Sequence, residues 1–221
     1  MGGSAQRMIA FIGGTGPEGL GLALRLAIAG EEVVIGSRSL ERAQQAAEKI
    51  RQRVPSARVS GAENAEAVRL ADVVFVTIPH AAQSPTLVEL APAIDEKVVI
   101  DTVVPLTFEG GQARYVSVAD GSATQEARRI LPHARVAAAF HNLSAEKLLA
   151  VDTTMEGDVI VCADDAQAKQ TAMALVGLIP GLRPVDGGGL VNACYVEQIT
   201  ALLLNLNRIH KRQTGIRIVG L

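Results

Sequence analysis

The feature that most constrains this chain is a short apolar strand that runs into closely spaced glycines, where an apolar helical stretch begins. The strand is expected over residues 9–13, and the glycines follow as Gly14, Gly16 and Gly19. Which glycine begins the motif is ambiguous, because Gly13 also starts a G-x-x-G-x-x-G series. Glycines let the backbone approach a pyrophosphate, and a helix N-terminus offers free N–H groups. The arrangement predicts a dinucleotide site in an α/β fold.

The end of the next expected strand indicates which nucleotide is bound. An NAD site usually has an Asp or Glu there, which bonds the ribose 2′-hydroxyl. This chain has Ser37 and Arg38 instead, with Arg42 one helical turn further. A hydroxyl and guanidinium groups suit a 2′-phosphate, so the sequence predicts NADP(H). The alternative is that Ser37 and Arg38 merely begin the next helix, with Ser39 as its N-cap.

Composition narrows the class of protein. The chain is 48% hydrophobic but only 3% aromatic, which suits a parallel sheet covered by helices. A net charge of −2 gives no reason to expect a nucleic-acid or anionic-membrane partner. No apolar run reaches the ~20 residues of a membrane span, and no signal peptide is visible, so a cytoplasmic location is expected. Cys162 and Cys194 match no metal or redox spacing, and we expect buried structural thiols and no metal.

Strand and helix patterns alternate along the chain, as a doubly wound sheet requires. Strands are expected at residues 9–13, 33–37, 58–60, 72–78, 98–102, 135–140 and 159–163. Helices are expected at residues 17–29, 40–53, 63–70, 122–131 and 193–208, with two more that end near residues 94 and 178. Residues 79–85 and 105–121 are expected to be loops. The pattern predicts a Rossmann-like, mostly parallel sheet with a small C-terminal helical appendage.

Three parts are expected in the chain. Residues 1–7 are polar and small, and are expected to be a disordered extension. Residues 8–186 form the nucleotide-binding domain, and residues 187–221 form a C-terminal helical segment. Gly187, Gly188 and Gly189 between them are expected to be a flexible hinge. The helix behind that hinge either packs over the cofactor cleft or a second subunit, or simply caps the core.

Histidines at two strand ends are the main candidates for chemistry, because ligands of an open α/β sheet bind beyond the carboxyl ends of its strands. His141 is expected to be a donor oriented at a substrate ring or nicotinamide; alternatively it bonds neighbouring backbone and shapes its loop. His80 is the weaker candidate. The chain has no Tyr-x-x-x-Lys pair and no H-E-x-x-H motif. Hydride transfer between two redox coenzymes requires fewer catalytic side chains than reduction of a carbonyl, since the cofactors carry the chemistry.

The stretch from Gly13 to Ala27, followed by Gly36-Ser37-Arg38, resembles the NADPH-dependent reductases of coenzyme F420, a 5-deazaflavin. The resemblance extends to residues 76–79, 139–141, 181–186 and 196–208, and so covers nearly everything from residue 8 to about residue 218. Two places depart from the family pattern. Asn142-Leu143-Ser144 stands where Thr-Ile-Pro is expected, and His80 stands where an aromatic residue is common. The resemblance implies that both places belong to the deazaflavin pocket and not to the NADP site.

The resemblance implies NADP phosphates at the glycine turn, a 2′-phosphate at Ser37, Arg38 and Arg42, and a meeting point of nicotinamide and deazaflavin beside Ile78, Pro79 and His141. The candidate cofactor-binding residues are Gly14, Thr15, Gly16, Pro17, Glu18, Gly19, Ser37, Arg38, Arg42, Ile78, Pro79 and His80. The candidate substrate-binding residues are His141, Asn142 and Leu143, with His141 also the catalytic candidate.

The expected function is reversible hydride transfer between NADP(H) and F420, in a homodimer or a higher homo-oligomer. One alternative is an NADPH-dependent reductase of another acceptor, such as a flavin, a metal chelate, a carbonyl or an imine. The other is a non-catalytic protein that senses NADPH and changes a partner interface.

Overall fold

The structure is a computed structural model that describes residues 7–221. Eight strands form one sheet in the order β10-β9-β8-β5-β4-β1-β2-β3, and two more form a separate hairpin. The sheet strands are β1 (Met8–Ile12), β2 (Glu32–Ser37), β3 (Val59–Glu63), β4 (Val73–Val76), β5 (Val98–Asp101), β8 (Arg135–Ala138), β9 (Gly157–Ala163) and β10 (Leu182–Asp186). All neighbouring pairs are parallel except β8 with β9. The predicted Rossmann-like, mostly parallel sheet is confirmed.

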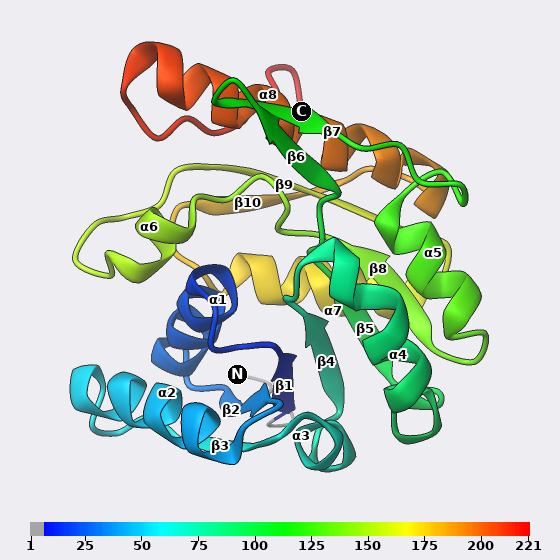
Figure 1. Cartoon of the computed structure of the whole chain (residues 1–221). Coiled ribbons are helices and arrows are strands. Elements are labelled where there is room, and N and C mark those ends of the chain that lie inside the picture. Colours follow the sequence, from blue (N-terminus) through cyan, green and yellow to red (C-terminus); the bar gives the residue numbers. More distant parts are fainter. Residues whose placement is uncertain (1–6) are drawn as a thin grey trace.

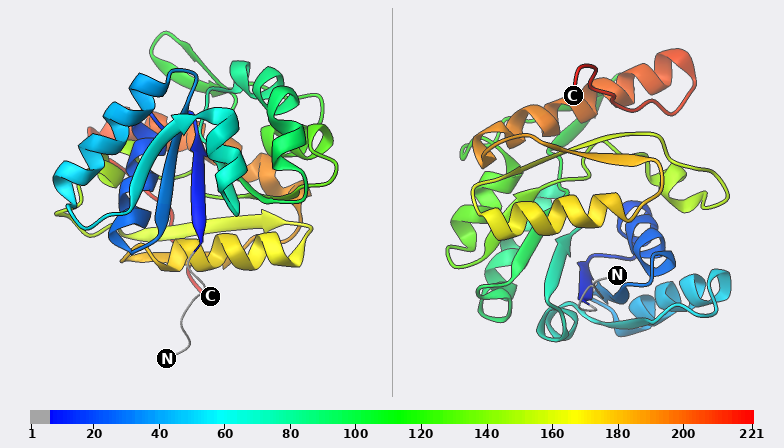
Figure 2. Two further views of the ribbon diagram at one scale, coloured as in Figure 1. Left: turned by 90° about the horizontal axis from the view of Figure 1, so that it is seen from below. Right: turned by 180° about the vertical axis from the view of Figure 1, so that it is seen from behind.

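Helices cover both faces of this sheet (Figures 1 and 2). They are α1 (Pro17–Ile28), α2 (Leu40–Arg53), α3 (Asn64–Leu70), α4 (His80–Ile94), α5 (Ala123–Ile130), α6 (Ala145–Leu149), α7 (Ala166–Gly177) and α8 (Ala193–His210), with a 3-10 turn at Leu190–Asn192. Side chains of β1 alternate between two cores. Ile9 and Phe11 pack with α1, α2 and α7, whereas Ala10 and Ile12 pack with α3, α4, α5 and α8.

The start of α4 differs from the prediction. Residues 79–85 were expected to form a loop because they contain two prolines, but the helix begins at His80 and includes Pro85 and Pro92. A proline inside a helix removes one hydrogen bond. The helix forms nevertheless, because Gln83 and Leu87 are fully buried against the rest of the fold. Packing therefore outweighs the local preference at this position.

A hairpin forms where a long loop was expected. Strands β6 (Leu106–Glu109) and β7 (Gln112–Tyr115) pair antiparallel within residues 105–121. Gly110 and Gly111 join them, both at positive φ (56° and 75°), as a tight two-residue turn requires. The hairpin lies beside α8 (Figure 1), because Asn205 exchanges hydrogen bonds with the backbone of Ala113 at 2.9 Å.

The glycine run before α8 is closely packed, not an open hinge. The N–H of Gly187 donates to the Val161 carbonyl, and a Cβ at this glycine would lie 2.5 Å from Ile160 Cγ2. The carbonyl of Gly188 accepts a hydrogen bond from Ala163 N–H. Gly187 is required by close approach to β9, Gly188 has φ of +83°, and a Cβ at Gly189 would lie 2.7 Å from Asp164 Oδ1. Helix α8 is thereby held firmly against the sheet.

Two further expectations concern the ends and the cysteines. The extension expected over residues 1–7 lies outside the described residues, except for Arg7, whose carbonyl accepts a hydrogen bond from Glu32 N–H.

Cys162 is buried and Cys194 is half-buried, and both are free thiols. Burial raises the pKa of Cys162 to about 11. None of the helices between residues 7 and 221 combines the length and the apolar character of a bilayer span.

Candidate active site

The glycine turn after β1 is shaped by close contacts with its neighbours. Gly13 has φ of +72°, and a Cβ there would lie 2.3 Å from Ile78 Cγ2. The N–H of Gly14 is already used, because it donates to the carbonyls of Phe11 and Gly36. Gly19 packs against Thr77, whose Oγ1 would lie 2.4 Å from an added Cβ. Gly14 and Gly19 therefore hold the turn against β2 and β4, while Gly13 and Gly16 line the cavity above it.

Helix α1 begins without a capping side chain. Gly16 is its N-cap and has no side chain to accept from the first turn, and Pro17 follows at the first helical position. Free N–H groups at such an end, together with the helix dipole, attract phosphate. The turn and the uncapped helix therefore fit the pyrophosphate of a dinucleotide.

A cavity of about 570 Å³ extends from this turn to the end of β2. Its lining includes Thr15, Ser37, Arg38 and Arg42. The alternative role of Ser39 as N-cap of α2 is confirmed, since its Oγ accepts from Arg42 N–H at 3.4 Å. The two roles coexist, because capping leaves both guanidinium groups at the cavity. Neither guanidinium forms an ion pair with any side chain in residues 7–221, so both are free for an anion.

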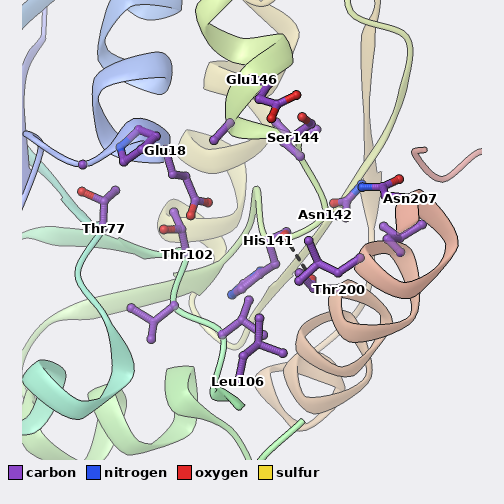
Figure 3. Close-up of a pocket in the computed structure, with 18 of the residues that line it drawn as sticks. Glu18, Thr77, Thr102, Leu106, His141, Asn142, Ser144, Glu146, Thr200 and Asn207 are labelled. Carbon is purple, nitrogen blue, oxygen red and sulfur yellow. Dashed lines mark hydrogen bonds between the residues drawn. The ribbon is translucent and has the colours of Figure 1, made fainter. Parts of the chain in front are cut away.

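A second cavity, of about 590 Å³, continues from the first toward α8 (Figure 3). The two cavities share Gly16, Thr77, Ile78 and Pro79, so they form one groove. The second cavity, here called the acceptor cleft, is lined by Gly16, Pro17, Glu18, Thr77, Ile78, Pro79, Thr102, Val103, Val104, Leu106, His141, Asn142, Leu143, Ser144, Ala145, Glu146, Thr200, Leu203, Leu204, Asn207, Gln213 and Thr214. Ile78 and Pro79 thus lie at the junction of the two cavities.

His141 lies in the acceptor cleft at the end of β8. The preceding residue, Phe140, is fully buried with φ of +69°, a conformation that costs energy in a non-glycine residue and is often found at functional sites. Thr200 Oγ1 of α8 donates to the His141 carbonyl at 3.0 Å. This left-handed residue and the contact to α8 together set the direction of the imidazole.

The imidazole of His141 has no hydrogen-bond partner within residues 7–221. Only 2% of His141 is exposed, and both Nδ1 and Nε2 are unpaired. Desolvation lowers the pKa of this group to about 3, so the ring is neutral near pH 7. Because buried polar atoms normally have partners, a neutral ring with both nitrogens unpaired fits a ligand that supplies them. The alternative, a ring that bonds neighbouring backbone, is not what the structure shows.

Asn142 and Leu143 continue the same wall of the cleft. The Asn142 amide donates through Nδ2 to the Asp158 carbonyl at 2.8 Å, which fixes the side chain on β9. Its Oδ1 is buried and unpaired, and can accept a hydrogen bond from a ligand. Leu143 adds an apolar surface beside it.

His80 lies outside both cavities. It is the first residue of α4, and its Nε2 lies 3.1 Å from Glu126 Oε2 of α5. The structure therefore directs this ring toward α5, away from the groove. The sequence could not show this, because the contact joins residues from different helices.

The far wall of the cleft comes from residues that sequence reasoning did not select. Thr200, Leu203, Leu204 and Asn207 of α8 line it, and the tail after α8 adds Gln213 and Thr214. Of the roles left open for this helix, packing over the cleft is confirmed, although the helix also buries residues in the core. Gln213 Nε2 donates to Glu146 Oε2 at 2.6 Å, which joins the tail to α6.

A buried carboxyl connects α8 with the hairpin and α5. Glu197 accepts hydrogen bonds from the N–H groups of Ala123 and Thr124 at 3.0 and 3.1 Å, and from the Tyr115 hydroxyl at 3.2 Å. Burial raises the pKa of Glu197, and these donors counteract the rise. Glu197 thus fixes α8 in the position where Thr200, one turn further along the helix, faces the cleft.

The comparisons with known proteins agree with this geometry. The family model described as "NADP oxidoreductase coenzyme F420-dependent" matches residues 8–105. The F420-dependent NADP reductase of Methanothermobacter marburgensis is 46% identical over 220 residues, which cover 96% of this chain and 98% of that protein. The F420-dependent NADP reductase of Methanocaldococcus jannaschii is 36% identical, over 96% of this chain and 98% of that protein.

One similar solved structure is a putative F420-dependent NADP reductase from Arthrobacter sp. FB24. It is 25% identical, has a TM-score of 0.80, and the match covers 96% of this chain and 99% of that one.

Proposed function

The chain belongs to the family of coenzyme F420-dependent NADP oxidoreductases, and on that premise we propose that it transfers hydride reversibly between NADP(H) and F420. The observation that carries this proposal is the single groove, in which a cationic nucleotide end and an acceptor end lined without Lys or Arg from residues 7–221 meet at Ile78 and Pro79. Hydride chemistry belongs to the two coenzymes, and the protein contributes binding and orientation.

At the nucleotide end, we assign the pyrophosphate to Thr15, Gly16 and the first turn of α1. We assign the 2′-phosphate to Ser37, Arg38 and Arg42. These assignments are supported by the uncapped helix and by the two guanidinium groups free of ion pairs within residues 7–221. A 2′-hydroxyl would meet no carboxylate here, so NADP(H) is the preferred nucleotide.

At the acceptor end, we assign His141 and Asn142 to the polar edge of the deazaflavin ring. A neutral imidazole and an unpaired amide oxygen can together donate to and accept from such an edge. Ile78 and Pro79 would lie at the contact between nicotinamide and deazaflavin. In this proposal residues 8–186 supply the nucleotide site, and residues 187–221 supply the wall that closes the acceptor cleft.

We also propose that the chain forms a homodimer in the cytoplasm. An apolar surface is exposed on the outer face of α8 and its neighbours, and consists of Phe108, Val191, Tyr195, Leu202 and Ile209. Within α8 the three members recur every seventh residue, as in a helix that packs against a partner. Both cysteines are free, which agrees with a reducing compartment.

The dimer is tested by sedimentation equilibrium of the wild type and of Leu202→Glu. The wild type is expected at twice the mass of 23.1 kDa, and a charge placed on the apolar surface is expected to give the monomer. A wild-type monomer at micromolar concentration would overturn this assignment. Leu202 is exposed, so the substitution leaves the core intact.

The reaction itself is tested by mixing the purified protein with NADPH and oxidised F420 without oxygen. Loss of absorbance at about 420 nm, the characteristic band of the oxidised deazaflavin, is expected with NADPH and not with an equal concentration of NADH. Binding of NADPH without any bleaching would retain the nucleotide site and move the activity to another acceptor.

A further inference from the structure

Glu18 occupies an unusual place for an acidic residue of a dinucleotide site. It is the second residue of α1, and its side chain extends into the acceptor cleft toward Thr102 (Figure 3). No hydrogen bond or ion pair joins its carboxyl to any other group in residues 7–221. Glu18 is only half-buried by area, so a ligand in the cleft can reach it.

No cationic side chain faces Glu18 in the cleft, because the lining drawn from residues 7–221 contains no Lys and no Arg. Only the N-terminal dipole of α1 favours a negative charge there. Its titratable members besides Glu18 are His141 at the end of β8, which is neutral, and Glu146 on α6. Burial raises the pKa of Asp101 at the end of β5 well above its usual range, and the nearby carboxyl groups, Glu18 among them, raise it further. Burial raises the pKa of Glu18 to about 8, so the carboxyl is mostly protonated near pH 7.

A bound dinucleotide would reinforce this state. The pyrophosphate assigned to the first turn of α1 would lie next to Glu18, and two like charges at close range disfavour ionisation of the carboxyl. Acidic residues often occur in the first turn of a helix because their charge complements the dipole. That explanation requires an ionised side chain, and so it does not fit a protonated Glu18 directed into a cleft.

We propose that Glu18 is a positioning residue that donates a hydrogen bond, as a neutral carboxylic acid, to a carbonyl oxygen on the ring of the acceptor coenzyme. The inference rests on the proposed function, because the acceptor is taken to be the deazaflavin. His141 and Glu18 would then hold the ring from two sides of one cleft, both uncharged. The cleft accordingly suits an acceptor whose ring presents carbonyl oxygens to neutral hydrogen-bond donors.

Loss of the proton should weaken acceptor binding. The carboxyl can donate only when protonated, so binding is complete below pH 8 and weakens as the pH rises through 8, by up to tenfold per unit. The test measures the dissociation constant of F420 between pH 6.5 and 9.5, with NADP⁺ present, by quenching of F420 fluorescence. The wild type is compared with Glu18→Gln, which keeps a neutral donor, and with Glu146→Gln, the matched change at the other glutamate of the cleft.

The expected result is weakening of F420 binding above pH 8 in the wild type and in Glu146→Gln, with nearly constant binding in Glu18→Gln. Any ionisation of F420 itself is common to the three proteins and cancels in the comparison. Equal pH dependence in Glu18→Gln and the wild type would overturn the inference while leaving the proposed function intact. No F420 binding to any of the three at any pH would overturn both.

A second readout does not depend on F420. Calorimetric titration with NADP⁺ at pH 8.5, in two buffers with different ionisation enthalpies, reports the protons taken up on binding. The wild type is expected to take up a fraction of a proton and Glu18→Gln almost none. Equal uptake by the two proteins would show that the carboxyl is not the group that titrates.

Discussion

The nucleotide end and the acceptor end of the groove are built from the chain in different ways. The nucleotide end comes mostly from one continuous stretch between Gly13 and Arg42, and its selective groups are cations. The acceptor end draws on α1, the ends of β4, β5 and β8, helices α6 and α8, and the tail, and no cationic side chain of residues 7–221 lines it. Most residues of the nucleotide end therefore lie close together in the sequence, whereas those of the acceptor end are brought together only by folding.

The difference also concerns how each end recognises its ligand. In our proposal, Arg38 and Arg42 act by charge and bidentate hydrogen bonds, which a phosphate satisfies. In our proposal, His141, Asn142 and Glu18 act through hydrogen bonds of uncharged groups, whose value depends on accurate placement. Substitutions that remove charge should therefore weaken binding at the nucleotide end. Substitutions that shift side chains should impair binding and turnover at the acceptor end.

The largest effect is expected when the cations of the nucleotide end are removed. Arg38→Ala should cost about 2–4 kcal/mol of NADP⁺ binding, because a charged, hydrogen-bonded phosphate contact is lost. Binding of NAD⁺ should change little, and F420 affinity should remain. Dissociation constants of both nucleotides measure this, with Arg69→Ala, an exposed arginine paired with Glu66, as the control. Unchanged NADP⁺ affinity in Arg38→Ala would refute the assignment of the 2′-phosphate.

The next effect concerns position at the acceptor end. His141→Ala should lower turnover on the order of 100-fold, because a ring misplaced by ~1 Å reacts far more slowly. NADPH affinity should change by much less than turnover. Steady-state kinetics with fixed F420 and varied NADPH separates the two quantities, and His133→Ala, at an exposed histidine, is the matched control. Normal turnover in His141→Ala would remove the imidazole from the site.

A smaller effect should reveal that the acceptor end depends on distant packing. Arg25 of α1 is buried, and its guanidinium donates to the carbonyls of Lys147, Leu148, Ala150 and Thr153, which hold the α6 region in place. Arg25→Met leaves these carbonyls without their donor and should destabilise the protein by about 1–3 kcal/mol. The KM for F420 should rise more than the KM for NADPH.

Chemical denaturation and the two KM values together test that prediction. Arg53→Met is the appropriate comparison, because Arg53 makes a single exposed contact with the same region, through the Leu149 carbonyl. Equal changes in both KM values would mean that Arg25 supports the whole groove and not the acceptor end.

Most residues that line the nucleotide end could be selected from the sequence, because they lie close together along the chain. The order of strand, glycines and helix fixes where a phosphate can lie, and Arg38 and Arg42 follow on the next element. Even here, sequence could not separate roles among glycines. Gly14 and Gly19 proved to hold the turn by close packing, which depends on Phe11, Ile35 and Thr77.

The acceptor end was predicted only in part. His141 could be found because it follows a buried strand at the ligand-binding edge of the sheet. Thr200, Asn207 and Gln213 could not, because their role depends on how α8 lies, and that is fixed by the buried contacts of Glu197 with α5 and the hairpin. The hairpin itself had one local signal, the pair Gly110 and Gly111. His80, in contrast, was selected from the sequence but does not line the groove, because in the folded chain its ring lies against Glu126 of α5.

The central claim is that both coenzymes occupy one groove and react directly where its two ends meet. It is tested most directly with NADPH that carries deuterium at C4, mixed with oxidised F420 in ordinary water. This structure predicts that the deuterium on one face of the nicotinamide is transferred to C5 of the reduced deazaflavin, with no loss to solvent. Appearance of the label in water, or turnover in which NADP⁺ leaves before F420 binds, would contradict a single continuous groove.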